Sequence, residues 1–165
     1  MVQNKNGGLY DKFRNRLMLP VIDTRGDVVA FGSRVLDKSE PKYMNSSETP
    51  VYSKRRVLYG LNLAKKSKRP NIILCEGNLD IVTLHQAGFD NAVASMGTAL
   101  TVEQTRLLSR FTKELVLCYD NDNAGKIATE RALQILNGSE FSVKVLQLPR
   151  RLVDGLSLIH ISEPT

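Results

Sequence analysis

The sequence predicts an α/β protein in which a parallel sheet flanked by helices follows a smaller, β-rich and basic subdomain. From Pro70 onward, strand-like apolar runs alternate with segments of helical spacing, which is typical of parallel strands joined by right-handed crossovers. Before Pro70, two apolar runs flank the turn-forming cluster "DTRGD". The net charge of +6 favours an anionic partner such as nucleic acid or a nucleotide.

The region before Pro70 is expected to contain a β-hairpin, formed by the apolar runs at 16–22 and 28–36 on either side of the turn. Pro20 has no N–H to donate, so it predicts an edge strand or a bulge. Residues 37–56 are polar and irregular, and we expect a long loop there, of a kind that is usually functional in a compact domain. A short helix is expected before the basic run that ends at Pro70.

After Pro70 we expect four strands and three helices in alternation. The expected strands are the apolar runs 71–77, 91–97, 114–120 and 141–149. The expected helices are 78–88, 101–111 and 124–138. Gly88 is a helix stop signal, and Thr101 with Gln104 has the spacing of a capping box.

The cysteines and the lengths of the apolar runs indicate the cellular compartment and argue against a zinc site or a membrane span. Cys75 and Cys118 each stand at the end of an apolar run, which predicts two buried thiols in a reducing compartment. No Cys/His cluster has zinc spacing. The N-terminus has no signal-peptide core, and no apolar run is long enough to cross a membrane. We therefore expect a cytoplasmic protein with no bound zinc and no membrane contact.

Acidic residues follow two of the predicted strands at the point where each strand ends. Glu76 follows the first, with Asp80 a turn later, and Asp120 and Asp122 follow the third. The carboxyl ends of parallel strands share one edge of the sheet, so these acids converge if the two strands are neighbours. An Asp-x-Asp pair by itself is as typical of a turn or helix cap. The added Glu-Gly at a second strand end favours a metal site.

A carboxylate cluster without histidine or thiolate suits a hard cation such as Mg²⁺. Metal-assisted phosphoryl or nucleotidyl transfer uses such sites. Glu76 is also a candidate general acid or base, provided that its neighbours raise its pKa.

Several segments together resemble one enzyme family. The text "EGNLD" at 76–80 and "YDNDNAG" at 119–125 resembles the two signature motifs of the Toprim domain, which occurs in bacterial-type primases, topoisomerases and some nucleases. "ASMGTALT" at 94–101 resembles a segment that bacterial-type primases carry between them. Upstream, "KFRNRLMLPVIDTRG", "VVAFGSRVL", "PKYMNSSETPVYSK" and "LYGLNLAK" are similar, in this order, to the catalytic core of bacterial DnaG-type primases. The resemblance covers residues 7–149.

The resemblance implies a Toprim-like sheet and the template-directed synthesis of RNA primers on single-stranded DNA from ribonucleoside triphosphates. It also implies a place in the primosome, with the replicative helicase as partner of the full-length family. Glu76, Asp120 and Asp122 would be catalytic and bind Mg²⁺ or Mn²⁺, with Asp80 as a supporting acid. The family's basic surface for the template and the incoming nucleotide would comprise Arg34, Lys42, Asn45, Lys54, Arg14 and Arg16.

The same resemblance suggests a division of the chain. Residues 1–69 would be part of an N-terminal basic α+β subdomain, residues 70–149 the Toprim domain, and residues 150–165 an atypical tail. The family has a Gly-Lys-Asp-Pro-Asp segment after the fourth strand, where this chain has "LPRRLVDGLSLIHISEPT". We therefore expect a fragment, with a foreign or frameshifted end and without the family's zinc-binding and helicase-binding domains.

Two other interpretations stay open. A nuclease or topoisomerase piece would share the Toprim motifs, although "PKYMNSSETP" argues against it. A non-catalytic single-stranded DNA-binding fragment would keep the basic loop. Tyr43 and Tyr52 in that loop are candidates for stacking on bases and equally for packing the loop onto the domain. His85 lies mid-helix without a partner acid, so we expect a structural role for it.

Overall fold

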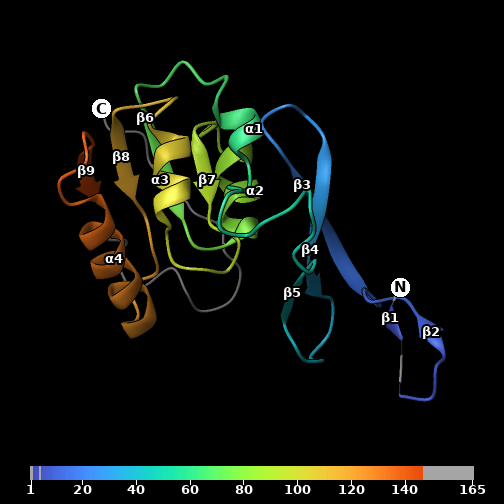
Figure 1. The fold of residues 1–165 in the computed structure, drawn as a ribbon. Helices are drawn as coiled ribbons and strands as arrows, with labels where there is room; N and C mark the ends of the chain where they lie inside the picture. The colour runs from blue at the N-terminus through green and yellow to red at the C-terminus, as the bar shows by residue number, and fades with distance from the viewer. Residues whose placement is uncertain (1, 4, 147–165) are drawn as a thin grey trace.

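The computed structural model describes residues 2–3 and 5–146, and places them in a parallel α/β unit and a smaller antiparallel unit (Figure 1). The predicted tail, residues 150–165, lies outside the described residues. No helix in the described part of the chain is long and apolar enough to cross a membrane.

The antiparallel unit is a three-stranded sheet in the order β3-β4-β5. Its strands are Arg16–Ile22, Val28–Val35 and Tyr43–Asn45. The predicted hairpin is confirmed, and Asp23 shapes its turn by accepting hydrogen bonds from the backbone N–H groups of Arg25 and Gly26. Pro20 lies on the edge strand β3, as its missing N–H requires. A short hairpin of β1 (Val2–Gln3) and β2 (Leu9–Tyr10) precedes this sheet.

The expectation of a loop throughout 37–56 is wrong at β5. Tyr43 pairs with Arg34, and Asn45 with Gly32, so this segment forms the third strand of the antiparallel sheet. A three-residue strand is too short to show an alternating pattern. Its pairing with β4, and not its own sequence, determines its conformation.

The parallel unit has the strand order β7-β6-β8-β9, which confirms the predicted fold class. Strands β6 to β9 are Asn71–Cys75, Ala92–Ala94, Glu114–Leu117 and Ser142–Val145. Helices α1 to α4 are Leu61–Ala64, Asn78–Gln86, Val102–Leu108 and Asn123–Leu136. Strands β6, β7 and β8 each end before the expected run does, and the residues left over form the loops at the carboxyl edge. The last residues of the expected run 141–149 lie outside the described residues.

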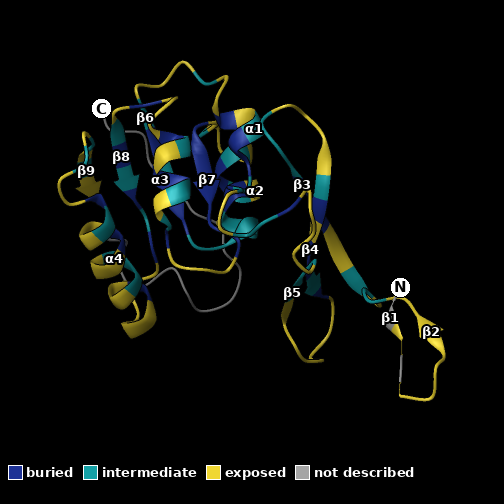
Figure 2. Ribbon diagram, in the orientation of Figure 1, coloured by how far each residue is buried: buried dark blue, intermediate teal, exposed yellow. Residues whose placement is uncertain are grey.

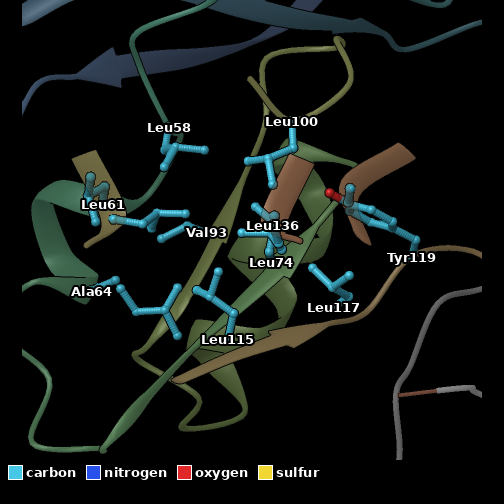
Figure 3. Packing of buried hydrophobic residues seen from close by; sticks show 13 residues of the cluster. Leu58, Leu61, Ala64, Leu74, Val93, Leu100, Leu115, Leu117, Tyr119 and Leu136 are labelled. Carbon is cyan, nitrogen blue, oxygen red and sulfur yellow. The ribbon is translucent and has the colours of Figure 1, made fainter. Parts of the chain in front are cut away.

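Two buried clusters cover the two faces of the parallel sheet. Leu74 and Leu117 point to one face, where they pack with residues of α1, α3 and α4 (Figure 3). Cys75 points to the other, where α2 contributes Ile81 and Leu84. Burial on both faces explains the nearly continuous apolar runs of these strands. Exposed residues lie mainly on the outer side of α4 and in the antiparallel unit (Figure 2).

The predicted capping box of α3 is confirmed and also fixes a loop. The Thr101 hydroxyl accepts from the Gln104 N–H, and the Gln104 side chain accepts from the Thr101 N–H, both at 3.1 Å. The buried Gln104 amide then donates to the carbonyls of Lys54 and Val57. The chain around Lys54 is therefore tied to the parallel unit. His85 has the expected structural role, because its ring bonds the Ala92 carbonyl oxygen.

Candidate metal and nucleotide site

The parallel pairing of β6 with β8 brings the two acidic segments to one edge of the sheet. Leu74 lies opposite Leu117, and the Cys118 N–H donates to the Leu74 carbonyl at 2.9 Å. Glu76 and Asp120 therefore leave the sheet side by side. The predicted convergence of the acidic residues required β6 and β8 to be neighbours, and they are.

Glu76 lies in a negative environment. Burial raises the pKa of its carboxyl group, and the charges of Asp120, Asp122 and Asp80 raise it further, while the Asp120 backbone N–H partly opposes them. The Glu76 Oε1 atom is buried and has no hydrogen-bond partner among the described residues. A buried oxygen without a donor is costly, so a proton or a cation would be stabilised at this atom.

Asp80 both shapes the turn after β6 and adds to this negative charge. Its Oδ2 accepts the Gly77 N–H at 3.1 Å. A Cβ at Gly77 would lie 2.7 Å from the same oxygen, so a larger residue there would displace the Asp80 carboxylate. Burial, followed by the charge of Asp120, raises the pKa of Asp80.

Asp122 is the N-cap of α4. Its Oδ1 accepts the Gly125 N–H at 2.7 Å, which leaves Oδ2 free of the cap. A Cβ at Gly125 would lie 1.9 Å from the Asp120 carbonyl oxygen, so only glycine lets the helix begin this close to the acidic turn. The positive end of the helix dipole lies beside these carboxylates and partly offsets their repulsion.

The four predicted acids thus gather around Asp120, whose charge raises the pKa of both Glu76 and Asp80. Among residues 2–3 and 5–146, no three acidic, cysteine or histidine side chains form a ready-made set of metal ligands. Mg²⁺ needs no such set, because it keeps several waters and uses one or two carboxylates together with substrate phosphates. The oxygen donors and the unpartnered Glu76 atom fit a hard cation.

A cavity of about 590 Å³ lies next to the acidic edge. Its charged lining residues are Arg34, Lys38 and Lys42 together with Asp37 and Glu40. We call it the basic cavity because cations outnumber acids in its lining. Arg34 and Lys42 line it together with Leu79, which stands three residues after Glu76. The Tyr43 ring lies beneath both cations, with the Arg34 Cζ at 5.6 Å and the Lys42 Nζ at 5.7 Å from its centroid. The structure therefore brings two of the predicted basic residues together, beside the turn that carries Glu76.

The other predicted basic-surface residues are more dispersed. The Asn45 amide donates to the Met96 carbonyl at 3.3 Å, so it ties β5 to the parallel unit. The Lys54 N–H donates to Glu48 and lowers the pKa of that carboxyl. Arg14 is exposed over the Tyr10 ring, and Arg16 has a buried Nη1 without a partner among the described residues. None of these four lines the basic cavity.

Tyr43 and Tyr52, the two candidates for stacking on bases, differ in their exposure to solvent. Tyr43 is 51% exposed, whereas Tyr52 is 1% exposed in a cluster with Val21 and Met96. The stacking role considered for both is therefore wrong for Tyr52, because its ring has no free face. Tyr43 keeps an exposed ring, with Arg34 and Lys42 close to it.

Sequence reasoning missed the part played by Gly125. It was expected only as a residue in the first turn of the helix, yet it permits the contact between α4 and Asp120. Glycine is unfavourable inside a helix, so its place in "DNDNAGK" was the available sign of a close backbone approach.

Two protein-family models match the chain, in the same order as its two structural units. Residues 1–65 match the DNA primase catalytic core, N-terminal domain, and residues 73–156 match the Toprim-like family. The chain therefore belongs to the Toprim-like family.

The relatives that the chain matches are DNA primases, and the chain is similar to part of a primase catalytic core. It is 47% identical over 150 residues to the DNA primase of Clostridium acetobutylicum, covering 90% of this chain and 25% of the relative. The E. coli primase catalytic core superposes with a TM-score of 0.85 at 41% identity, covering 91% of this chain and 50% of that one. A DnaG primase catalytic domain bound to ssDNA gives 0.83 at 40% identity, covering 90% and 49%. The chain spans about a quarter of the length of the curated relatives it matches.

The substitution Glu76→Gln is expected to stabilise the metal-free protein at neutral pH. The pKa of Glu76 is raised above its ordinary value of 4.5, so the folded state holds the proton over a range in which the unfolded chain releases it. The stability of the folded state therefore falls as the pH rises through this range. We expect Tm in EDTA at neutral pH to rise by about 1–2 °C, a small gain because Glu76 is partly exposed and solvent screens part of the repulsion.

The gain should disappear below the ordinary glutamate pKa, where both states are protonated. Glu130→Gln, on an exposed position of α4, is the matched control and should leave Tm unchanged. A lower Tm for Glu76→Gln at neutral pH would contradict the repulsion described here.

Proposed function

We propose that this chain carries a nucleotidyl-transfer centre of a DNA primase, which joins ribonucleotides into a primer on a single-stranded DNA template. The observation that carries the proposal is the adjacency of the acidic edge and the Arg34–Lys42 cavity. A polymerase centre must hold a metal-bound triphosphate beside a nucleic acid backbone, and these two surfaces supply the opposite charges that it needs.

In this proposal, Glu76, Asp120 and Asp122 hold Mg²⁺ or Mn²⁺, and Asp80 maintains the turn and adds negative charge. The bound ion would neutralise phosphate charge and lower the pKa of the attacking hydroxyl. Asp122 would contribute its Oδ2 atom, because Oδ1 caps α4. Glu76, whose pKa is raised by burial and by the neighbouring carboxylates, is the candidate general acid or base.

Arg34 and Lys42 would bind phosphates of the template or of the incoming ribonucleotide, and Tyr43 would stack on a base. The exposed Tyr43 ring gives a sequence-tolerant platform of the kind that single-strand binding proteins use. A similar DnaG primase catalytic domain has been solved bound to ssDNA, which supports this assignment. Asn45 and Lys54 would act by positioning the strands and loop around the cavity.

A second candidate is a single-stranded DNA-binding fragment without catalysis. The exposed Tyr43 ring near Arg34 and Lys42 favours it, because stacking and phosphate binding need no metal. The match of residues 1–65 to a primase domain argues against the other alternative, a nuclease or topoisomerase piece. Metal binding separates the two remaining functions.

Calorimetric titration with Mn²⁺ tests the metal site. The chain should show saturable binding, and Asp120→Asn should weaken it by roughly tenfold or more, because it removes a charged oxygen ligand. Asp122→Asn keeps a good helix cap, so weakened binding in this variant would report on the metal and not on α4. Glu130→Gln should bind as the parent chain does. No binding by the folded parent chain would favour the non-catalytic fragment.

Binding of single-stranded DNA at several salt concentrations tests the basic cavity. Lys42→Ala should weaken binding and lower the slope of log K against log salt by about 0.7, the value for one phosphate contact on a single strand. Lys66→Ala is the matched control, because Lys66 is an exposed lysine before β6, at the opposite edge of the sheet. Equal effects of the two substitutions would mean that only net charge matters, which would contradict a site at the cavity.

A further inference from the structure

The only two cysteines of the chain lie against each other beneath the acidic edge. Cys75 is the last residue of β6, and Cys118 follows the end of β8. They occupy the register position directly after the Leu74–Leu117 pair. Both belong to the α2 face of the sheet, where Cys118 packs against the cluster that contains Cys75.

The positions of the two residues meet the first requirement of a disulfide. Neighbouring strands lie about 4.7–4.9 Å apart, and bridged cysteines have Cα separations of about 4.4–6.8 Å. Both thiols are free in this structure. We propose that Cys75 and Cys118 form an oxidisable pair, a modification site that hydrogen peroxide converts to a disulfide between the ends of β6 and β8.

The exposure of the two thiols sets the order of the reaction. Cys118 is half-buried and Cys75 is 2% exposed, so the peroxide meets Cys118 first. The Cys118 sulfur attacks one peroxide oxygen, the O–O bond breaks, and a sulfenic acid and one water result. The Cys75 sulfur then attacks the Cys118 sulfur, forming the S–S bond and releasing a second water. Two thiols lose two electrons and two protons, and the peroxide is reduced to water.

The pair is placed to act on the acidic edge. Cys75 immediately precedes Glu76, and Cys118 stands two residues before Asp120. A covalent link would fix the spacing of the strand ends from which both acids project. This consequence, unlike the disulfide itself, rests on the proposed metal site.

Mass spectrometry of the peroxide-treated full chain, alkylated with N-ethylmaleimide, tests the modification. We expect both thiols to disappear together, with the loss of two hydrogen atoms and no alkylation. Trypsin should then release the peptide Glu114–Lys126 joined to the peptide that contains Cys75 and ends at Arg106. Dithiothreitol should separate the two.

Cys118→Ser and Cys75→Ala are the control variants, and neither should show the loss of two hydrogens. Two alkylated thiols in the treated parent chain would overturn the proposal. A disulfide that joins different molecules would overturn it as well. The masses that test the disulfide are measured on the parent chain. A variant that fails to fold therefore does not change the outcome of the test.

Mn²⁺ titration of the oxidised chain, and of the same sample after reduction and desalting, tests the coupling. We expect oxidation to weaken Mn²⁺ binding by roughly tenfold, as when outer groups of a metal site are disturbed, and reduction to restore it. Equal affinities would overturn the coupling. Absence of binding in the reduced chain would overturn the proposed metal site and the coupling together, whereas the mass measurement would still decide the modification.

Discussion

The parallel pairing of β6 with β8 is the constraint on which the remaining features of the site depend. It aligns Leu74 with Leu117 in the core and, one residue further on, places Cys75 by Cys118. Glu76 then follows Cys75, and Asp120 comes two residues after Cys118, close enough for its backbone N–H to bond the Glu76 carboxyl group. Burial of both faces of the sheet fixes this register, because a shift by one residue would exchange the two faces. The hydrophobic core therefore determines which side chains meet at the carboxyl edge.

Charge is distributed unevenly around this edge. Four carboxylates gather there, and the raised pKa values of Glu76 and Asp80 show that the fold bears an electrostatic cost in the metal-free state. The adjoining cavity is basic through Arg34 and Lys42. Separated charges of this kind suit a ligand that brings a cation and phosphates together, such as the metal complex of a nucleoside triphosphate. The primase function proposed for the chain requires that ligand.

The sequence was sufficient to predict the parallel unit, because its strands and helices are long enough to show a period. It also predicted the acids, because each follows an apolar run and matches a family motif. Local sequence could not predict β5, whose three residues become a strand only by pairing with β4. Nor could it separate Tyr43 from Tyr52: both stand in one polar segment, but tertiary packing buries only Tyr52. The proximity of the two cysteines was equally hidden, since Cys118 stands 43 positions after Cys75 in the sequence.

Anomalous diffraction from crystals of the chain soaked in Mn²⁺ tests most directly whether the acidic edge binds a metal ion. We expect an anomalous peak between the ends of β6 and β8, in contact with carboxylate oxygens of Glu76 and Asp120. A peak bound by other residues, with the acidic edge empty in the same crystal, would contradict it. In that case the repulsion at the edge would need another explanation, and the chain would be better described as a DNA-binding fragment.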